Sequence, residues 1–169
     1  MGLTRFLTNY IITDTVLETP HVVVAAAIAV KIANPALAIP LALGSHFVLE
    51  KVPHWNPHLN TELKKYGKVS QRSTKIVVVD ALASLILGGS IAYMMLPDTK
   101  HAVIVLTACL FGVLPDLIEA PYFFLRKKSQ FLEKVWIPLQ KSLQVDTSPL
   151  PGLTTQFITV LAAFWWILG

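Results

Sequence analysis

Residues 99–125 read TKHAVIVLTACLFGVLPDLIEAPYFFL, and this stretch decides the class of fold. It is longer than the roughly 20 mostly apolar residues that carry a helix across a bilayer. Lys100, Asp116 and Glu119 are the only Lys, Arg, Asp or Glu residues in it. The stretch therefore predicts a membrane-spanning helix rather than a helix of a soluble core.

Outward from this stretch, further apolar segments predict an all-α helical bundle with four to five membrane helices. Thr19-Pro20 is typical of a helix start, because a hydroxyl can cap the helix and proline fits its first turn. Pro53 and Pro57 end the second helix, and Pro97-Asp98 ends the third. The predicted membrane helices are 21–33, 35–52, 73–96, 99–125 and 153–169. The first two are short, so they form either a spanning or a re-entrant hairpin.

The remaining segments complete a single membrane domain over residues 1–169. Residues 1–19 are mixed in polarity and predict an interfacial amphipathic segment, followed by a helical core over 20–125. Residues 126–152 are expected to form a basic amphipathic segment on the membrane surface and a linker. Its apolar residues at helical spacing are Phe131, Leu132, Val135, Trp136 and Leu139.

Composition supports a membrane protein and excludes several other classes. The chain of 169 residues is 54% hydrophobic and only 14% charged, with a mean hydropathy of +0.59. Soluble domains carry about 25% charged residues, and a small soluble domain buries a limited share of its surface. A soluble enzyme, a disordered chain and a nucleic-acid-binding domain are therefore not expected. Cys109 is the only cysteine, which excludes an internal disulfide and a zinc-thiolate cluster.

The basic residues predict the orientation in the membrane. Ten of them fall in the loops 60–75 and 126–141, which the helix order places on one side, whereas Lys31 and Lys100 lie on the other. Positive loops mark the cytoplasmic face, so both loops are expected there. The lysines would attract anionic lipid headgroups, and membrane lipids are the expected partners.

Ionisable residues inside the predicted helices form one layer. Asp80, Asp116 and His46 each lie roughly 10–15 Å below the cytoplasmic boundary at 1.5 Å per residue, and His21 opens the first helix on that side. His46 and Glu50 are four residues apart and share a helix face. Such residues are costly in a membrane and indicate function.

The charge balance in this layer predicts a bound cation. Glu50, Asp80, Asp116 and Glu119 share their layer with no Lys or Arg, and a divalent metal would compensate their charge. Histidine with carboxylate favours zinc, with manganese or iron as alternatives, at one or two ions per chain. The predicted ligands are His21, His46, Glu50, Asp80 and Asp116.

Three segments of this layer also resemble a known family. Gly44-Ser45-His46-Phe47-Val48-Leu49-Glu50-Lys51-Val52-Pro53-His54-Trp55 is similar to the Ser-His-x-x-x-Asp-x-x-Pro-His-Trp segment of small bacterial membrane-bound metal-dependent hydrolases. Thr19-Pro20-His21 and Gly112-Val113-Leu114-Pro115-Asp116 resemble two further motifs of that family. More distantly, the pattern is similar to the zinc-dependent phospholipase C group. Glu50 stands where the family pattern has aspartate.

The resemblance implies a hydrolase of the bacterial inner membrane with its site facing the cytoplasm. The depth of the layer points to a phosphoester substrate, such as a phospholipid. His54 or Glu119 would act as the general acid or base, beside a polar cleft between the second and fourth helices. The alternative is a non-catalytic membrane protein in which the same layer holds a structural metal or conducts a metal ion.

Overall fold

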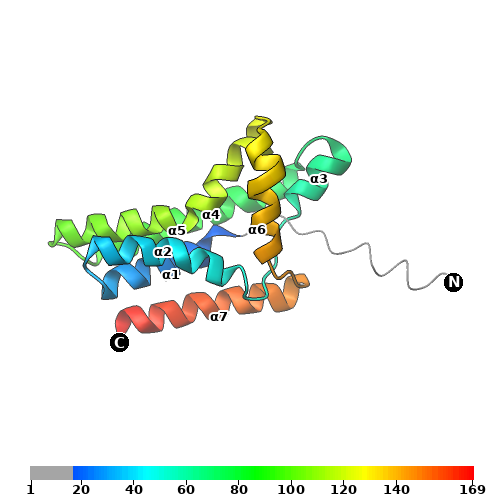
Figure 1. Cartoon of the computed structure of the whole chain (residues 1–169). Helices are drawn as coiled ribbons and strands as arrows, with labels where there is room; N and C mark the ends of the chain where they lie inside the picture. Colours follow the sequence, from blue (N-terminus) through cyan, green and yellow to red (C-terminus); the bar gives the residue numbers. More distant parts are fainter. Residues whose placement is uncertain (1–16) are drawn as a thin grey trace.

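The computed structural model describes residues 17–169, and within that range it is helical and has no strand. The expected interfacial segment 1–19 falls almost wholly outside the described residues. Figure 1 shows α1, α2, α4, α5 and α7 running side by side, with α6 across one end of the bundle. The helices are α1 Glu18–Lys31, α2 Pro35–Leu49, α3 Leu59–Tyr66, α4 Gln71–Tyr93, α5 Thr99–Leu125, the π-helical turn η1 Leu132–Trp136, α6 Ile137–Leu143 and α7 Pro149–Leu168.

The central element is α1, which packs against α2, α4, α5 and α7. Its middle turns carry Ala25, Ala26, Ala27 and Ala29, all without exposed surface. Small side chains let neighbouring helices approach closely, which is how helices associate in membranes. A short alanine-rich helix thus forms the core, and longer helices surround it.

Three helices are long and apolar enough to cross a membrane: α4, α5 and α7. Their outward faces carry large exposed apolar side chains such as Leu85, Ile86 and Leu161. By contrast, α1 has 14 residues and α2 has 15, so each is about 22 Å long, against a hydrocarbon core of about 30 Å. The bundle therefore has three candidate spans by length and composition, and the hairpin α1–α2 is packed among them.

Several predicted helix boundaries were wrong. The first helix covers Glu18–Lys31 rather than 21–33, and α4 covers Gln71–Tyr93 rather than 73–96. The second helix ends at Leu49 rather than at residue 52, four residues before Pro53. The last helix begins at Pro149, inside the predicted linker. Proline is tolerated in a first helical turn because its missing N–H would have no partner there.

The two basic loops lie at the same end of the bundle, as the helix order predicted. Leu59 of α3 packs in one apolar cluster with Phe123 of α5, Leu132 and Ile137. Phe131, Val135 and Leu139 of the 126–144 segment are exposed, whereas Leu132 is buried. The segment therefore presents an apolar stripe outward while its other face covers the bundle end.

Candidate metal centre

His21, His46 and Asp116 form a buried group that could hold a metal ion. They come from α1, α2 and α5, and one possible ligand atom of each lies within 4.8 Å of those of the other two. The three residues are 1%, 0% and 4% exposed. Three of the five predicted ligands are thus brought together from positions up to 95 residues apart (116 − 21).

Gly112 makes this meeting possible, because it lets α5 approach α1. A Cβ added at Gly112 would lie 2.6 Å from Ala25 Cβ and 3.2 Å from the carbonyl oxygen of His21. Any larger residue would push the two helices apart. Asp116 follows one turn later on α5 and so lies beside His21.

The same glycine orients His46. His46 Nδ1 lies 3.0 Å from the carbonyl oxygen of Gly112, and only a protonated nitrogen can donate to a carbonyl. Nε2 is then the nitrogen that remains to bind a metal. Metal-binding histidines commonly fix their tautomer through such a hydrogen bond.

Glu50 reaches the group from the end of α2. Its Oε1 atom lies 3.6 Å from His21 Nε2 and 3.9 Å from His46 Nε2, so the predicted shared face of His46 and Glu50 is confirmed. Ligand atoms around a tetrahedral zinc ion lie about 3.3 Å apart when each is about 2.0 Å from the metal. Glu50 Oε1 thus lies a few tenths of an ångström farther from each histidine nitrogen than two ligands of one zinc ion would be.

Several buried polar atoms in this layer have no hydrogen-bond partner among the described residues. They include His21 Nδ1, Asp116 Oδ2 and both carboxylate oxygens of Glu50. Leaving a buried polar group unpaired costs about 1–3 kcal/mol, and more for a charged group. These side chains therefore fit a cation, which would satisfy several of the atoms at once.

Asp80 lies elsewhere, at the start of α1. Its carboxylate accepts hydrogen bonds from the backbone N–H of Glu18 and from Thr19 Oγ1, the latter at 2.6 Å. A carboxylate at a helix N-terminus stabilises the orphan N–H groups there. The structure thus gives Asp80 a capping role. Thr19 does not cap the helix itself, contrary to the expectation, because its hydroxyl is directed to Asp80.

His54 is held close to the group by a short backbone bridge. Its N–H donates to the carbonyl of Val145 at 3.1 Å, and its carbonyl accepts from Thr147 at 3.0 Å. Its Nδ1 donates to the carbonyl of Val52, which leaves Nε2 buried and without a partner among the described residues. Burial lowers the pKa of His54, so the ring is neutral near pH 7.

Glu119, the other predicted acid or base, lies one turn after Asp116 and is also buried. It is near enough to Glu50 and Asp116 to interact electrostatically with both. The expected polar cleft between the helices over 35–52 and 99–125 stays a prediction. A cavity of about 10 Å³, room for about one water, lies beside His21 and His54 and reaches toward Gln156 and Thr159 of α7.

Sequence reasoning missed two residues of this site. Gln140 of α6 is buried, and its Nε2 lies 3.4 Å from both His46 Nε2 and Asp116 Oδ1. Gln140 follows Trp136 by four residues and so lies on the buried face of the amphipathic segment. This spacing could have identified it from the sequence. Glu18 directly precedes the Thr19-Pro20-His21 motif and interacts electrostatically with Asp80, Glu50 and Asp116.

Comparison of the chain with protein-family models, with curated proteins and with solved structures finds no match. The resemblance to membrane-bound hydrolases therefore stays a prediction from three motifs, and the functional argument depends on the geometry of the site.

Proposed function

We propose that the protein is a membrane-embedded, metal-dependent hydrolase that acts on a phosphoester of a lipid. The observation that carries the proposal is the buried group of His21, His46 and Asp116, with Glu50 at 3.6–3.9 Å from both histidines. Nitrogen and carboxylate ligands of this kind suit zinc, with manganese or iron as alternatives. The proposed centre holds one or two ions.

A divalent ion bound there would supply Lewis acidity toward a phosphoryl oxygen and toward a water molecule. The chain's own residues would orient the site and transfer the proton. The carbonyl of Gly112 orients His46 through Nδ1, and Gln140 Nε2 lies 3.4 Å from both His46 Nε2 and Asp116 Oδ1. His54 Nε2 and the carboxylate of Glu119 are the groups proposed to accept and return a proton.

The proposed substrate class follows from the surroundings of the site. Exposed apolar side chains on α4 and α5 would face lipid, and exposed Lys65, Lys68, Lys127 and Lys128 lie in the loops at the metal-centre end. Basic residues near a membrane surface attract anionic headgroups, each by about 1 kcal/mol. A lipid phosphoester would thus be concentrated where the proposed centre lies.

Metal content is the first test of the proposal. Protein purified without chelator should contain zinc, manganese or iron at one or two ions per chain, and His46→Ala with Asp116→Ala should remove it. His101→Ala with Asp98→Ala is the matched control, because this pair lies at the far end of α5. Metal-free native protein, measured by elemental analysis, would end the proposal.

Turnover is the second test. Release of phosphate or of a phosphorylated headgroup from phospholipid vesicles should fall by about 100-fold in His54→Ala or Glu119→Gln, the usual contribution of a general acid or base. His58→Ala and Glu133→Gln, at exposed positions, are the controls. Unchanged turnover in both variants would remove His54 and Glu119 from the mechanism.

Orientation in the bacterial inner membrane is proposed from the lysine distribution, with the site facing the cytoplasm. Lys65→Cys and Lys128→Cys place single thiols in the two loops, and native Cys109 is buried. Both introduced thiols should react with an impermeant reagent in inside-out vesicles only. Reaction in right-side-out vesicles would reverse the orientation.

A structural metal is the second candidate function, and the enclosure of the group favours it. His46 and Glu50 have no exposed surface. A structural ion is closed by four protein ligands, whereas a catalytic ion keeps one position open. Bound metal that does not exchange, together with no turnover on any phospholipid, would support this alternative.

A further inference from the structure

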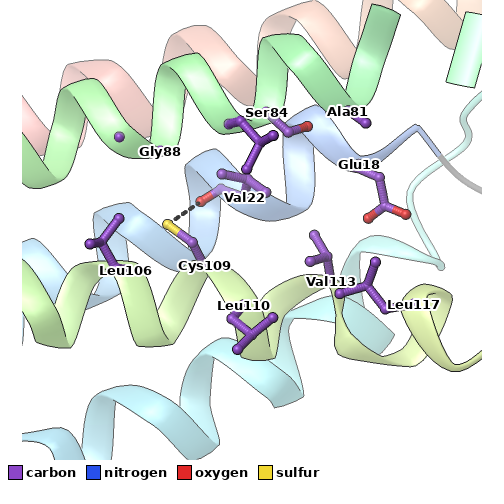
Figure 2. Close-up of a pocket in the computed structure, with 12 residues that line it drawn as sticks. Glu18, Val22, Ala81, Ser84, Gly88, Leu106, Cys109, Leu110, Val113 and Leu117 are labelled. Atoms are coloured by element: carbon purple, nitrogen blue, oxygen red, sulfur yellow. Dashed lines mark hydrogen bonds between the residues drawn. The ribbon is translucent and has the colours of Figure 1, made fainter. Parts of the chain in front are cut away.

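An apolar groove lies between α4 and α5, with α1 as its floor, and encloses about 300 Å³. Figure 2 shows Val22 of α1 beneath it, Ser84 and Gly88 on one side, and Leu106, Cys109 and Leu110 on the other. Its walls are almost entirely apolar, and the lining residues with a polar side chain are Ser84, Cys109 and, at one end, Glu18. We propose that this groove binds one acyl chain of a membrane lipid, with the polar end of that lipid at Glu18.

The position of the groove determines what fills it. Both α4 and α5 are candidate membrane spans, and the groove's rim residues Leu85, Leu106 and Leu110 are exposed. In a bilayer, the medium around these residues is lipid hydrocarbon. A cavity of about 10–15 Å³ on this measure holds one water molecule, so the groove has room for ten or more groups of that size, such as the methylenes of an acyl chain.

Two adjacent glycines shape the groove differently. A Cβ added at Gly88 would lie 2.9 Å from Val22 Cγ1, so Gly88 is needed for α4 to approach α1. A Cβ added at Gly89 would meet no atom of residues 17–169 within 4 Å, although Gly89 also lines the groove. The open space above Gly89 is therefore available to a ligand.

Glu18 gives the groove a polar end. The Glu18 Oε2 atom is buried and has no hydrogen-bond partner among residues 17–169, and Figure 2 shows the carboxylate beside Val113 and Leu117. A hydroxyl or ammonium group of a lipid could donate to it. Glu18 also interacts electrostatically with Asp116 of the metal group. A chain in the groove would thus hold its polar end beside the proposed metal centre.

The binding site does not depend on catalysis, but the view that its lipid is the substrate rests on the proposed function. The groove would then select lipids that have at least one long acyl chain, and water-soluble phosphoesters with the same headgroup would be poor substrates. His46→Ala with Asp116→Ala separates the two ideas: this variant should lose metal and turnover while it keeps the lipid.

Gly89→Leu is the test variant, because the leucine side chain would occupy the groove without a clash. Gly44→Leu is the matched control, since Gly44 is also helical, exposed and open, and does not line the groove. The probe is phosphatidylglycerol with a photoreactive diazirine in mid-chain, added to detergent-solubilised protein and mapped by mass spectrometry. Melting temperatures confirm that both variants fold.

In the unmodified protein, crosslinks should fall on α4 and α5 peptides that line the groove and should be displaced by excess unlabelled lipid. Gly89→Leu should reduce them about tenfold, because a filled cavity cannot accept a chain without costly overpacking, and Gly44→Leu should not. Equal crosslinking in both variants, or crosslinks that unlabelled lipid does not displace, would overturn the inference. A Gly89→Leu variant that changes from dimer to monomer without a change in lipid crosslinking would also overturn the inference, since a second copy of the chain would then be the occupant.

Discussion

The two halves of α1 are buried to a similar degree, yet their surroundings differ sharply. In the second half, the side chains of Ala25, Ala26, Ala27 and Ala29 pack in the apolar core and carry no polar atom. In the first half, His21 lies close to His46, Glu50 and Asp116, and several of their polar atoms have no hydrogen-bond partner within residues 17–169. Because unpaired buried polar groups destabilise a fold, packing alone explains the apolar half, whereas the polar half has the composition of a group that could hold a metal ion.

Removal of the proposed metal should give the largest change in the free energy of unfolding. An ion present at 1,000 times its dissociation constant stabilises the folded state by about 4 kcal/mol, so chelation should lower the free energy of unfolding by about that amount. Unfolding followed by fluorescence, with and without chelator, measures the change. His46→Ala with Asp116→Ala should make stability independent of chelator, and a chelator effect that persists would place the ion elsewhere.

The close contact of Gly112 on α5 with Ala25 and His21 on α1 should give the next largest effect on stability. Gly112→Ala should destabilise the protein by about 1–3 kcal/mol, because its Cβ would overlap Ala25. Gly44→Ala is the control and should stabilise by up to about 1 kcal/mol, as alanine does in an open helical position. If both variants change stability in the same direction, α1 and α5 are not packed as closely as the structure indicates.

Gln140 tests whether the polar half is organised for a metal. Gln140→Leu should weaken metal affinity about tenfold or more, as the loss of a residue that supports metal ligands usually does. Stability in the presence of chelator should be little changed, since leucine fills a similar volume. Titration with zinc by calorimetry gives the affinity, and an unchanged value would exclude Gln140 from the centre.

Glu62 shows what a carboxylate looks like when the protein itself satisfies it. Its oxygens accept hydrogen bonds from the Ser70 N–H at 2.7 Å, the Ser70 hydroxyl at 2.9 Å and the Ser73 hydroxyl at 2.7 Å. Burial acts to raise the pKa of Glu62, but these hydrogen bonds outweigh it and lower the pKa below its ordinary value of 4.5. The contrast is with Glu50, whose two buried oxygens accept no hydrogen bond from the part of the chain that the structure describes.

Loss of the hydrogen bonds between Glu62, Ser70 and Ser73 should give the smallest effect on stability. A carboxyl group with a lowered pKa stabilises the folded state above its unfolded pKa, and that contribution disappears as the pH falls through the folded pKa. Glu62→Gln should therefore reduce the loss of stability between pH 5 and pH 3, measured by denaturant unfolding. Ser70→Ala should cost about 1 kcal/mol at pH 7, because Ser70 also caps α4. An unchanged pH dependence in Glu62→Gln would contradict the network.

Local sequence patterns were sufficient for much of the site. His46 and Glu50 share a face because four residues make about one helical turn, and the structure places their side chains together. The sequence also concentrated its buried ionisable residues near one end. It could not distinguish Asp80 from Asp116, because both are aspartates in apolar helices, and only their neighbours give one a capping role and the other a place beside two histidines.

The sequence by itself determined that the chain is helical and apolar enough to enter a membrane, because hydropathy and helical periodicity depend on residues near one another in the chain. Only the tertiary structure decided which polar residues meet. Gln140 contacts His46, which lies 94 positions earlier in the chain. Gly112 lets α5 pack closely against α1, and no local sequence pattern shows this contact. The physical reason is that packing between helices depends on where side chains are absent as much as on where they are present.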